Sequence, residues 1–385
     1  MTPDSSRTKA RQRIRVAVDA FKGIPPEKAY VTLGIGGGFA LDEFISCDGS
    51  RHTMNRAFLN VLAHYLGNLD AFQGCLMDAG ATGLHIFVEA DPARACKTAC
   101  RLLEGVSNLP VEREAFERAR ETAIERFARY YKDESFRAHY HAFEKLHYNK
   151  RFSLSSLAHD VKGITFEEFS SLLGMLLEPG NLCMHILGSI DYEQLRALDT
   201  ALSNEVGHRP SIQWVASPRD PYLCQDAHVV IRGRTELCVT VIALLTDCLE
   251  ATAAEKRLLV DLLASVPGLP ACVVEADALD AGLIFEQQRP KPVKSQLAFP
   301  GPDTFEAARG AVLARYASMA KNDPRAYGAL ATDAILSGFT VSDYLESVSA
   351  CSFSDFEQVR MKLDPFLREF QVVVERVSGH GRVVS

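Results

Sequence analysis

The sequence lacks the patterns that mark several large classes of proteins. No segment approaches the run of about 18 apolar residues that a membrane helix requires. The N-terminal stretch is polar and then basic, without the apolar core of a secretory signal. Basic residues form no run interleaved with aromatic ones, and the formal net charge of −7 disfavours a phosphate-binding surface. We therefore expect a cytoplasmic protein that binds neither a membrane nor a nucleic acid.

Motifs for metal, nucleotide and nucleophile sites are also scarce. The ten cysteines are scattered without a C-x-x-C pair, and only Cys96 and Cys100 share a helical spacing, so we interpret them as reduced, core-facing thiols. Glycines crowd residues 34–38, but no Gly-Lys-Ser/Thr sequence closes a phosphate loop there. No G-x-S-x-G sequence marks a nucleophilic serine. These absences disfavour a structural zinc site, a nucleotide site and a serine hydrolase.

Three histidines, His139, His141 and His147, lie close together in the sequence. Residues two apart on a helix diverge by about 200°, so His139 and His141 cannot hold one ion in a helix, although they could in a strand. The apolar spacing predicts a helix over 135–148, which disfavours a metal site at these histidines.

The composition is that of an ordinary globular protein. A length of 385 residues favours two or three domains, each large enough for its own core. Hydrophobic residues make up 47% of the chain and charged residues 24%, as in typical soluble domains.

The second half of the chain repeats the order of elements in the first half. The predicted long helix AFERARETAIERFARYYKDE (115–134) aligns without a gap to TFEAARGAVLARYASMAKND (304–323). The helix RAFLNVLAHYLG (56–67) aligns in its apolar pattern to RLLVDLLASVPG (257–268). The first copy is predicted to contain strands at 12–19, 29–35, 84–90 and 181–190 and helices at 54–67, 92–105, 112–133, 135–148 and 165–177.

Strands separated by helices in this uneven order predict an α+β fold. We expect two tandem homologous α/β-sandwich domains, each with a mainly antiparallel sheet and helices on one face. The first domain is placed at 1–206, a connector that contains Pro, Gly and Ser at 207–222, and the second domain at 223–385. Two long copies are too few for a solenoid.

One segment and the duplicated unit resemble a known family. The letters AHYLGN (63–68) resemble the A-H-F-L-E-H of the pitrilysin, insulinase and mitochondrial-processing-peptidase family, whose inverted zinc motif is H-x-x-E-H. The stretches EREAFERARETAIERFARYYKDES and PGNLCMHILGSID also resemble the family module. The resemblance covers nearly the whole chain and implies the LuxS- and processing-peptidase-like metallopeptidase fold.

The zinc motif is degenerate in this frame. His64 stands at the first His, Gly67 at the Glu and Asn68 at the second His, and Phe127 aligns with the third ligand on the long helix. Catalysis in the family needs three protein ligands for zinc, a water in the fourth position and the Glu of the motif as general base. The resemblance therefore implies that this chain has no catalytic residue and no metal of its own.

Two further comparisons with the family concern the third ligand and the substrate-holding residues. Glu121 and Glu125 are alternatives to Phe127 for the third ligand, because they lie close to it on the same predicted helix. The stretch FQGCLMDAGATG (72–83) fits the frame F-x-E-L-R-E-x-x-G-L-A-Y, whose Arg and Tyr hold substrate in the family. In this chain Leu76 stands at the Arg and Gly83 at the Tyr, so the substrate-holding residues are replaced as well.

The resemblance implies the non-catalytic subunit of a heterodimeric zinc peptidase. Such a chain completes the peptide-binding chamber of a homologous catalytic subunit, which carries the zinc and processes peptides or precursor peptides. We expect the peptide to add as a strand to an edge formed by YVTLGI (30–35) or LHIFVEA (84–90). Gly36, Gly37 and Gly38 would let its backbone approach closely, with an ordinary turn as the alternative.

Two other interpretations remain open. One is a purely structural or chaperone-like, peptide-binding protein of the same fold without protease activity. The other is an active metallopeptidase whose ligands lie elsewhere in the chain. A neighbouring reading frame with an intact H-x-x-E-H would favour the heterodimer, and stoichiometric zinc in this chain alone would favour the active enzyme.

Overall fold

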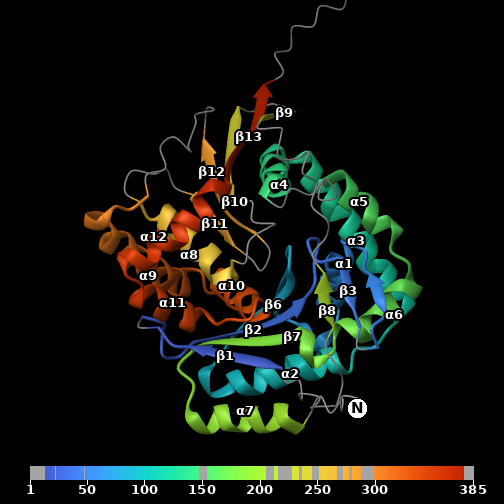
Figure 1. The fold of residues 1–385 in the computed structure, drawn as a ribbon. Helices are drawn as coiled ribbons and strands as arrows, with labels where there is room; N and C mark the ends of the chain where they lie inside the picture. The colour runs from blue at the N-terminus through green and yellow to red at the C-terminus, as the bar shows by residue number, and fades with distance from the viewer. Residues whose placement is uncertain are drawn as a thin grey trace, which may run out of the picture.

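The chain forms two similar halves, seen in the computed structural model of Figure 1. Their described residues form two five-stranded sheets and one three-stranded sheet. No helix in the described part of the chain is long and apolar enough to cross a membrane. The structure describes residues 14–376 except 22, 47, 147–153, 205–211, 216–227, 234–235, 245–250, 267–271, 277–279 and 288–298.

The sheet of the first half has the strand order β1-β7-β2-β6-β5. β1 and β7 run parallel, and the other neighbouring pairs are antiparallel. β2 lies at the centre and is buried along its whole length, which explains its nearly continuous apolar sequence. The strands are β1 (Arg15–Asp19), β2 (Ala29–Gly36), β5 (Leu76–Ala79), β6 (Gly83–Ala90) and β7 (Leu182–Gly188).

The described part of the first half contains seven helices. α1 contacts β5 and β6, α2 contacts β2, and α3 packs on α1. Thr165 caps α6 by accepting a hydrogen bond from the backbone N–H of Glu168 at 3.1 Å. The helices are α1 (Phe58–Gly67), α2 (Ala95–Ser107), α3 (Arg113–Lys132), α4 (Glu134–Leu146), α5 (Leu154–Gly163), α6 (Phe166–Leu176) and α7 (Tyr192–Asn204).

The second half repeats the plan with the order β11-β12-β10-β13-β9. Its one parallel pair, β13 with β9, is the counterpart of β7 with β1. The strands are β9 (His228–Gly233), β10 (Leu237–Leu244), β11 (Cys272–Ala276), β12 (Ala281–Gln287) and β13 (Leu367–Arg376). The helices are α8 (Ala253–Ala264), α9 (Pro302–Asn322), α10 (Pro324–Leu336), α11 (Val341–Ala350) and α12 (Phe353–Leu363).

The described part of the chain also contains smaller elements. A small sheet with the order β4-β3-β8 lies beside the first half. Its strands are β3 (Glu43–Ile45), β4 (Arg51–Thr53) and β8 (Gln213–Val215), and four 3₁₀ turns are η1 (Asp70–Phe72), η2 (Pro92–Arg94), η4 (Pro179–Asn181) and η7 (Asp364–Phe366).

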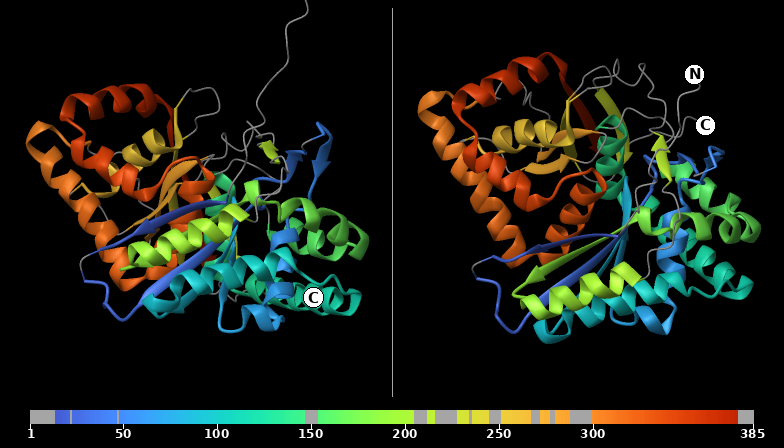
Figure 2. Two further views of the ribbon diagram at one scale, coloured as in Figure 1. Left: turned by 90° about the horizontal axis from the view of Figure 1, so that it is seen from below. Right: turned by 60° about the horizontal axis from the view of Figure 1, so that its bottom comes forward.

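Each half lends one helix to the sheet of the other half. α10 packs on β2, β7 and β6 of the first sheet, and α4 packs on β10 and β13 of the second. Figures 1 and 2 show α10 on the face of the first sheet opposite α2. Thus each sheet has helices of its own half on one face, as predicted, and a helix of the other half on the opposite face.

Glycines permit the close approach of these exchanged helices. A Cβ on Gly34 of β2 would lie 2.7 Å from Sγ of Cys183 and 2.9 Å from Cβ of Thr332, which belongs to α10. A Cβ on Gly282 of β12 would lie 2.5 Å from Cδ1 of Leu146, which belongs to α4. Both contacts need the small volume of glycine, so the packing of each exchanged helix depends on the glycine opposite it.

The α+β fold and the duplication are confirmed, but one expectation about the sheet is wrong. The strands β2 and β6, which contain YVTLGI and LHIFVEA, lie inside the first sheet, and its edges are β1 and β5. An extended peptide cannot add to a strand whose two sides are already paired. Most of the connector 207–222 lies outside the described residues, and its described part includes β8, paired with β3.

Candidate functional site

The pocket-facing side of α1 carries three residues at helical spacing. Asn60, Ala63 and His64 lie at positions i, i+3 and i+4, and all three line a pocket of about 140 Å³. The helix is fixed in this orientation because its opposite face is apolar and buried, with Phe58, Val61 and Tyr65 in the core. The first half therefore presents a small polar patch from a helix that is otherwise packed.

Four other elements complete this pocket, which we call the α1 pocket. α3 contributes Arg126 and Phe127, and the edge strand β5 contributes Asp78. Aromatic rings form most of the remaining wall, and they are Phe39, Tyr130, Phe136 and Tyr140. The rings of Tyr130 and Phe136 stack with centroids 4.2 Å apart, which joins α3 to α4 beside the pocket.

The electrostatic environment of the α1 pocket is positive. Burial and the nearby charges of Arg126 and Arg129 lower the pKa of His64 below its usual value. Arg126 is held in place because its Nε donates a hydrogen bond to the hydroxyl of Tyr130 at 2.6 Å. Its guanidinium also lies 5.4 Å from the centroid of that ring. His64 is therefore favoured in its neutral form beside a fixed cation.

The residues of this pocket do not fit a zinc ion. Zinc in a catalytic site takes three nitrogen, sulfur or carboxylate ligands, and here the wall offers one imidazole and the exposed carboxylate of Asp78 among an amide, an arginine and aromatic rings. In the described residues no group of three His, Cys, Asp or Glu side chains is placed to hold a metal. Glu121 and Glu125, the alternative third ligands, lie on the exposed side of α3 and do not line the pocket.

Gly67 and Asn68, two of the predicted motif positions, lie away from the α1 pocket. Gly67 is the exposed last residue of α1, and Asn68 is its C-cap. Neither lines the pocket, whereas His64 and Phe127 do. Of the four predicted motif positions, the structure therefore brings together only His64 and Phe127.

The spacing H-x-x-E-H can be placed on α1 in two ways that retain His64. The first uses positions 64, 67 and 68, and the second uses Asn60, Ala63 and His64 as H, E and H. Only the second frame places all three positions on the wall of the pocket. In the sequence this second frame reads N-x-x-A-H. It can be recognised only when the face of the helix that lines the pocket is known.

The glycines predicted to approach a peptide are enclosed by the protein itself. Gly37 and Gly38 have φ values of 121° and 144°, which few other residues adopt. A Cβ on Gly37 would lie 2.8 Å from the ring of Trp214, and one on Gly38 would meet the backbone of Ala81. Gly36 is buried, and its carbonyl accepts a hydrogen bond from the side chain of Asn181 at 2.9 Å. Their role at a peptide stays a prediction.

A second cavity of about 350 Å³ adjoins the first and lies between the two halves. It shares Phe39, Asp78, Ala79, Phe136 and Tyr140 with the α1 pocket. Its remaining walls include His139 from α4, Asp280 before β12 and Asp333 from α10. The two exchanged helices thus meet the edge of the first sheet at this cavity.

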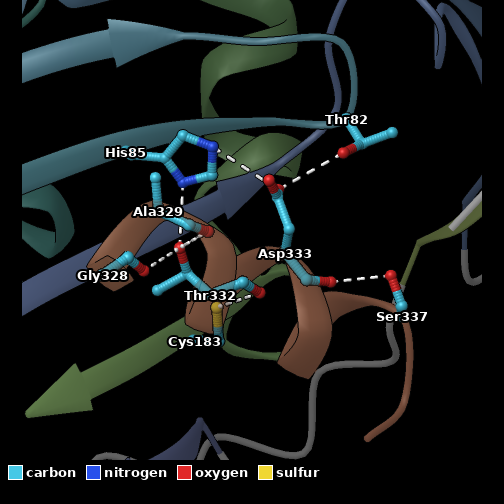
Figure 3. A network of polar contacts seen from close by, with 8 residues as sticks. All are labelled: Thr82, His85, Cys183, Gly328, Ala329, Thr332, Asp333 and Ser337. Atoms are coloured by element: carbon cyan, nitrogen blue, oxygen red, sulfur yellow. Dashed lines mark hydrogen bonds and ion pairs between the residues drawn. The ribbon is translucent and has the colours of Figure 1, made fainter. Parts of the chain in front are cut away.

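A polar network beside this cavity joins β6 to α10 (Figure 3). Nδ1 of His85 lies 2.9 Å from the hydroxyl of Thr332, and its Nε2 lies 3.4 Å from the carboxylate of Asp333. The hydroxyl of Thr82 donates to the same carboxylate at 3.3 Å, and burial raises the pKa of Asp333. This network holds the second half onto the first sheet.

The network resembles a Thr-His-Asp triad in composition but not in geometry. The hydroxyl of Thr332 is fully buried and lies 2.9 Å from the carbonyl oxygens of Gly328 and Ala329. Because carbonyl oxygens only accept, the hydroxyl proton is committed to the helix backbone and Nδ1 of His85 donates to Thr332. Thr332 therefore has neither the access nor the base that a nucleophile needs.

The two histidines of α4 that the sequence placed near each other have separate contacts. His139 lies 3.5 Å from a carboxylate oxygen of Glu286, and His141 lies 2.7 Å from one of Glu144. The helical geometry keeps them apart, as predicted, and His147 lies outside the described residues.

The comparisons with known proteins agree with this architecture. The sequence matches no family model and no curated protein. The structure is similar to an M16-like peptidase from Alicyclobacillus acidocaldarius, with a TM-score of 0.72 at 12% identity over 95% of this chain and 97% of that chain. The chain has the fold of an M16 peptidase. At this identity the likeness establishes the fold alone.

Two other solved structures with the M16-like fold are relevant to function. A peptidase M16 inactive domain from Pseudomonas fluorescens has a TM-score of 0.62 at 13% identity, over 95% of this chain and 96% of that one. A chain of complex III2 from Candida albicans has a TM-score of 0.62 at 12% identity, over 93% of each chain. The fold is therefore found both in an M16-like peptidase and in proteins described otherwise.

Proposed function

We propose that this chain is the non-catalytic subunit of a heterodimeric peptidase with the M16 fold. The observation that carries the proposal is the α1 pocket, in which Asn60, Ala63 and His64 occupy the spacing of H-x-x-E-H. This set supplies one imidazole and no carboxylate, so it offers neither the ligands for zinc nor the base for hydrolysis. Zinc is expected in a homologous catalytic partner.

The same region supports a role in holding the peptide. β5 is an edge strand of the first sheet and pairs with β6 on one side. Asp78 and Ala79 of this strand line both cavities. A peptide that adds to the free side of β5 would receive backbone hydrogen bonds and would run past two cavities able to accept its side chains.

Co-expression with a catalytic partner tests the proposal. A chain with an intact H-x-x-E-H motif is purified alone and together with this chain, and cleavage of a set of fluorogenic peptides is measured. We expect the two chains to co-elute and the mixture to cleave peptides faster than the partner alone. A partner in which the Glu of the motif is replaced by Gln serves as the control, because its mixture should be inactive.

Two results would contradict this function. One is separate elution of the two chains combined with equal cleavage by the partner with and without this chain. The other is stoichiometric zinc in this chain purified alone, which would indicate an active enzyme with ligands outside the α1 pocket.

A purely structural or chaperone-like protein is the second candidate. The similarity to a chain of complex III2 favours it, because that chain belongs to a complex that is not described as a peptidase. This function predicts binding of a peptide or a partner without any cleavage. The co-expression experiment separates the two, since only the peptidase subunit changes the rate of hydrolysis.

A further inference from the structure

The α1 pocket contains a fixed positive charge, the guanidinium of Arg126, that forms no ion pair within the described part of the chain. Arg126 donates to Tyr130 through Nε, which leaves its terminal nitrogens to other contacts. In the part of the chain that the structure describes, no carboxylate lies within ion-pairing distance of Arg126. A partly buried guanidinium at a pocket wall favours an anionic group, and most strongly a carboxylate, whose geometry it matches.

The other polar side chains of the pocket are compatible with an anion. Asn60 provides an amide donor, and His64 provides a ring nitrogen on the next turn of the same helix. Asp78 is the acidic residue of the described pocket wall, but 61% of its side chain is exposed and it pairs with Arg325 at 3.5 Å. Its charge is therefore directed toward solvent and is partly compensated.

The rest of the wall determines which chemical group, attached to the carboxylate, fits into the pocket. Aromatic rings from α3 and α4, including Phe127 and Phe136, surround the polar patch. The volume of about 140 Å³ has room for roughly four or five water molecules, which is the size of one small side chain or the end of a chain. An apolar group attached to a carboxylate therefore fits better than a larger polar ligand.

We propose that the α1 pocket binds a carboxylate of a peptide, with Arg126 as its main donor and Asn60 and His64 beside it. The inference rests on the proposed peptide-holding function, because the peptide reaches the pocket along β5. The carboxylate is either the C-terminus of the peptide or the side chain of Asp or Glu. An intact H-x-x-E-H would hold a metal cation at this place in the fold. In this chain the same place would hold an anion.

Four small probes separate the two sources without a peptide strand or a partner chain. N-acetyl-valine and its amide test the C-terminal carboxylate, and the α-amides of N-acetyl-glutamate and N-acetyl-glutamine test the side chain. Binding to the full chain is followed by saturation-transfer NMR. For ligands of this size we expect a Kd on the order of a millimolar. The amide of the favoured pair should bind about tenfold more weakly or worse.

A matched pair of variants locates the binding. Arg126→Gln should weaken the favoured carboxylate about tenfold or more. Arg118→Gln removes the same charge from the same helix at an exposed position outside the pocket, and it should retain binding within about twofold. Thermal unfolding of both variants shows that the comparison is between folded proteins.

The proposal is overturned if neither carboxylate binds better than its amide, or if the two arginine variants weaken binding equally. These results are independent of the partner, so they can fail while the heterodimer stands. Conversely, binding of a carboxylate probe through Arg126 would persist even if the co-expression experiment showed no peptidase subunit.

Discussion

The wall of the α1 pocket shows how single substitutions change the use of a site while its helix is retained. In the second copy the aligned helix places Asp261 at the position of Asn60. Asp261 is buried and accepts hydrogen bonds from the hydroxyls of Tyr316 at 2.7 Å and Tyr344 at 2.6 Å. It also pairs with Arg315, the residue aligned with Arg126. In the second copy an internal ion pair thus occupies the position that is open in the first copy.

The lowered pKa of His64 predicts how acid affects stability. Burial and two arginines depress its folded-state pKa, so between this value and about 6.5 the unfolded chain binds a proton that the folded chain does not. His64 therefore opposes folding as the pH falls through this window. Replacing His64 by Gln should reduce the loss of unfolding free energy between pH 7.5 and pH 5.5, measured by urea denaturation.

His52 provides the control for this experiment, because its ring lies outside the pocket and contacts Phe44 and Ser46. The variant His52→Gln should lose as much unfolding free energy between pH 7.5 and pH 5.5 as the unsubstituted protein does. An unchanged acid sensitivity in His64→Gln would show that the histidine is not responsible for it.

At the scale of elements, α10 determines how closely the two halves pack. Gly34 is the contact point, since an added Cβ would lie 2.7 Å from Sγ of Cys183 and 2.9 Å from Cβ of Thr332. Neither neighbour can move freely, because Cys183 is fully buried in β7 and Thr332 is bonded to its helix backbone. Gly34→Ala should lower the free energy of unfolding by about 1–3 kcal/mol in urea denaturation.

Gly67→Ala is the matched control in the same half. A Cβ at this exposed end of α1 would meet nothing within 4 Å. Alanine should leave stability unchanged or raise it by up to about 1 kcal/mol, since it favours helix over glycine. Equal effects of the two substitutions would show that the contact of α10 with β2 does not limit packing.

At the scale of the whole molecule, the exchange of α4 and α10 should make the two halves unfold together. In the second half, Asp261→Ala removes the buried carboxylate that pairs with both Arg257 and Arg315, at an expected cost of about 3–5 kcal/mol. Trp214, the single tryptophan, reports on the first half because it packs on Gly37 and donates to Asn181 at 2.8 Å. Tryptophan fluorescence and circular dichroism should therefore shift equally in urea.

The control for this prediction is Glu346→Ala on the exposed side of α11, which should change stability by less than about 0.5 kcal/mol. If the fluorescence of Trp214 kept its midpoint in Asp261→Ala while circular dichroism showed an earlier transition, the halves would unfold independently and the prediction would be wrong.

Local periodicity predicted most elements of this chain. The apolar stripe of the long helix matches α3 at Arg113–Lys132, and the continuous apolar run at 29–35 matches β2. Repetition in the sequence predicted the second half because the same pattern buries the same faces. The helices α5 and α7 and the strands β3, β4, β5 and β8 of the first half were missed. These four strands have only three or four residues, too few to show a period of two.

The site was predictable in part. The sequence identified His64 and Phe127 as members of one site, and both line the α1 pocket. It did not identify Asn60 or Arg126, because which turn of a helix faces a pocket depends on what packs against the other side. Likewise, the choice of peptide edge was wrong because strand order is set by long-range pairing and not by the hydrophobicity of one strand.

The sequence by itself determined the elements, their duplication and the degeneracy of H-x-x-E-H, because these depend on residue identity and local spacing. Only the tertiary structure decided which helix covers which sheet, which strand is an edge, and which face of α1 meets Arg126. These features arise from contacts between residues far apart in the chain, such as Gly34 with Thr332 and α4 with β10, whose partners no local pattern specifies.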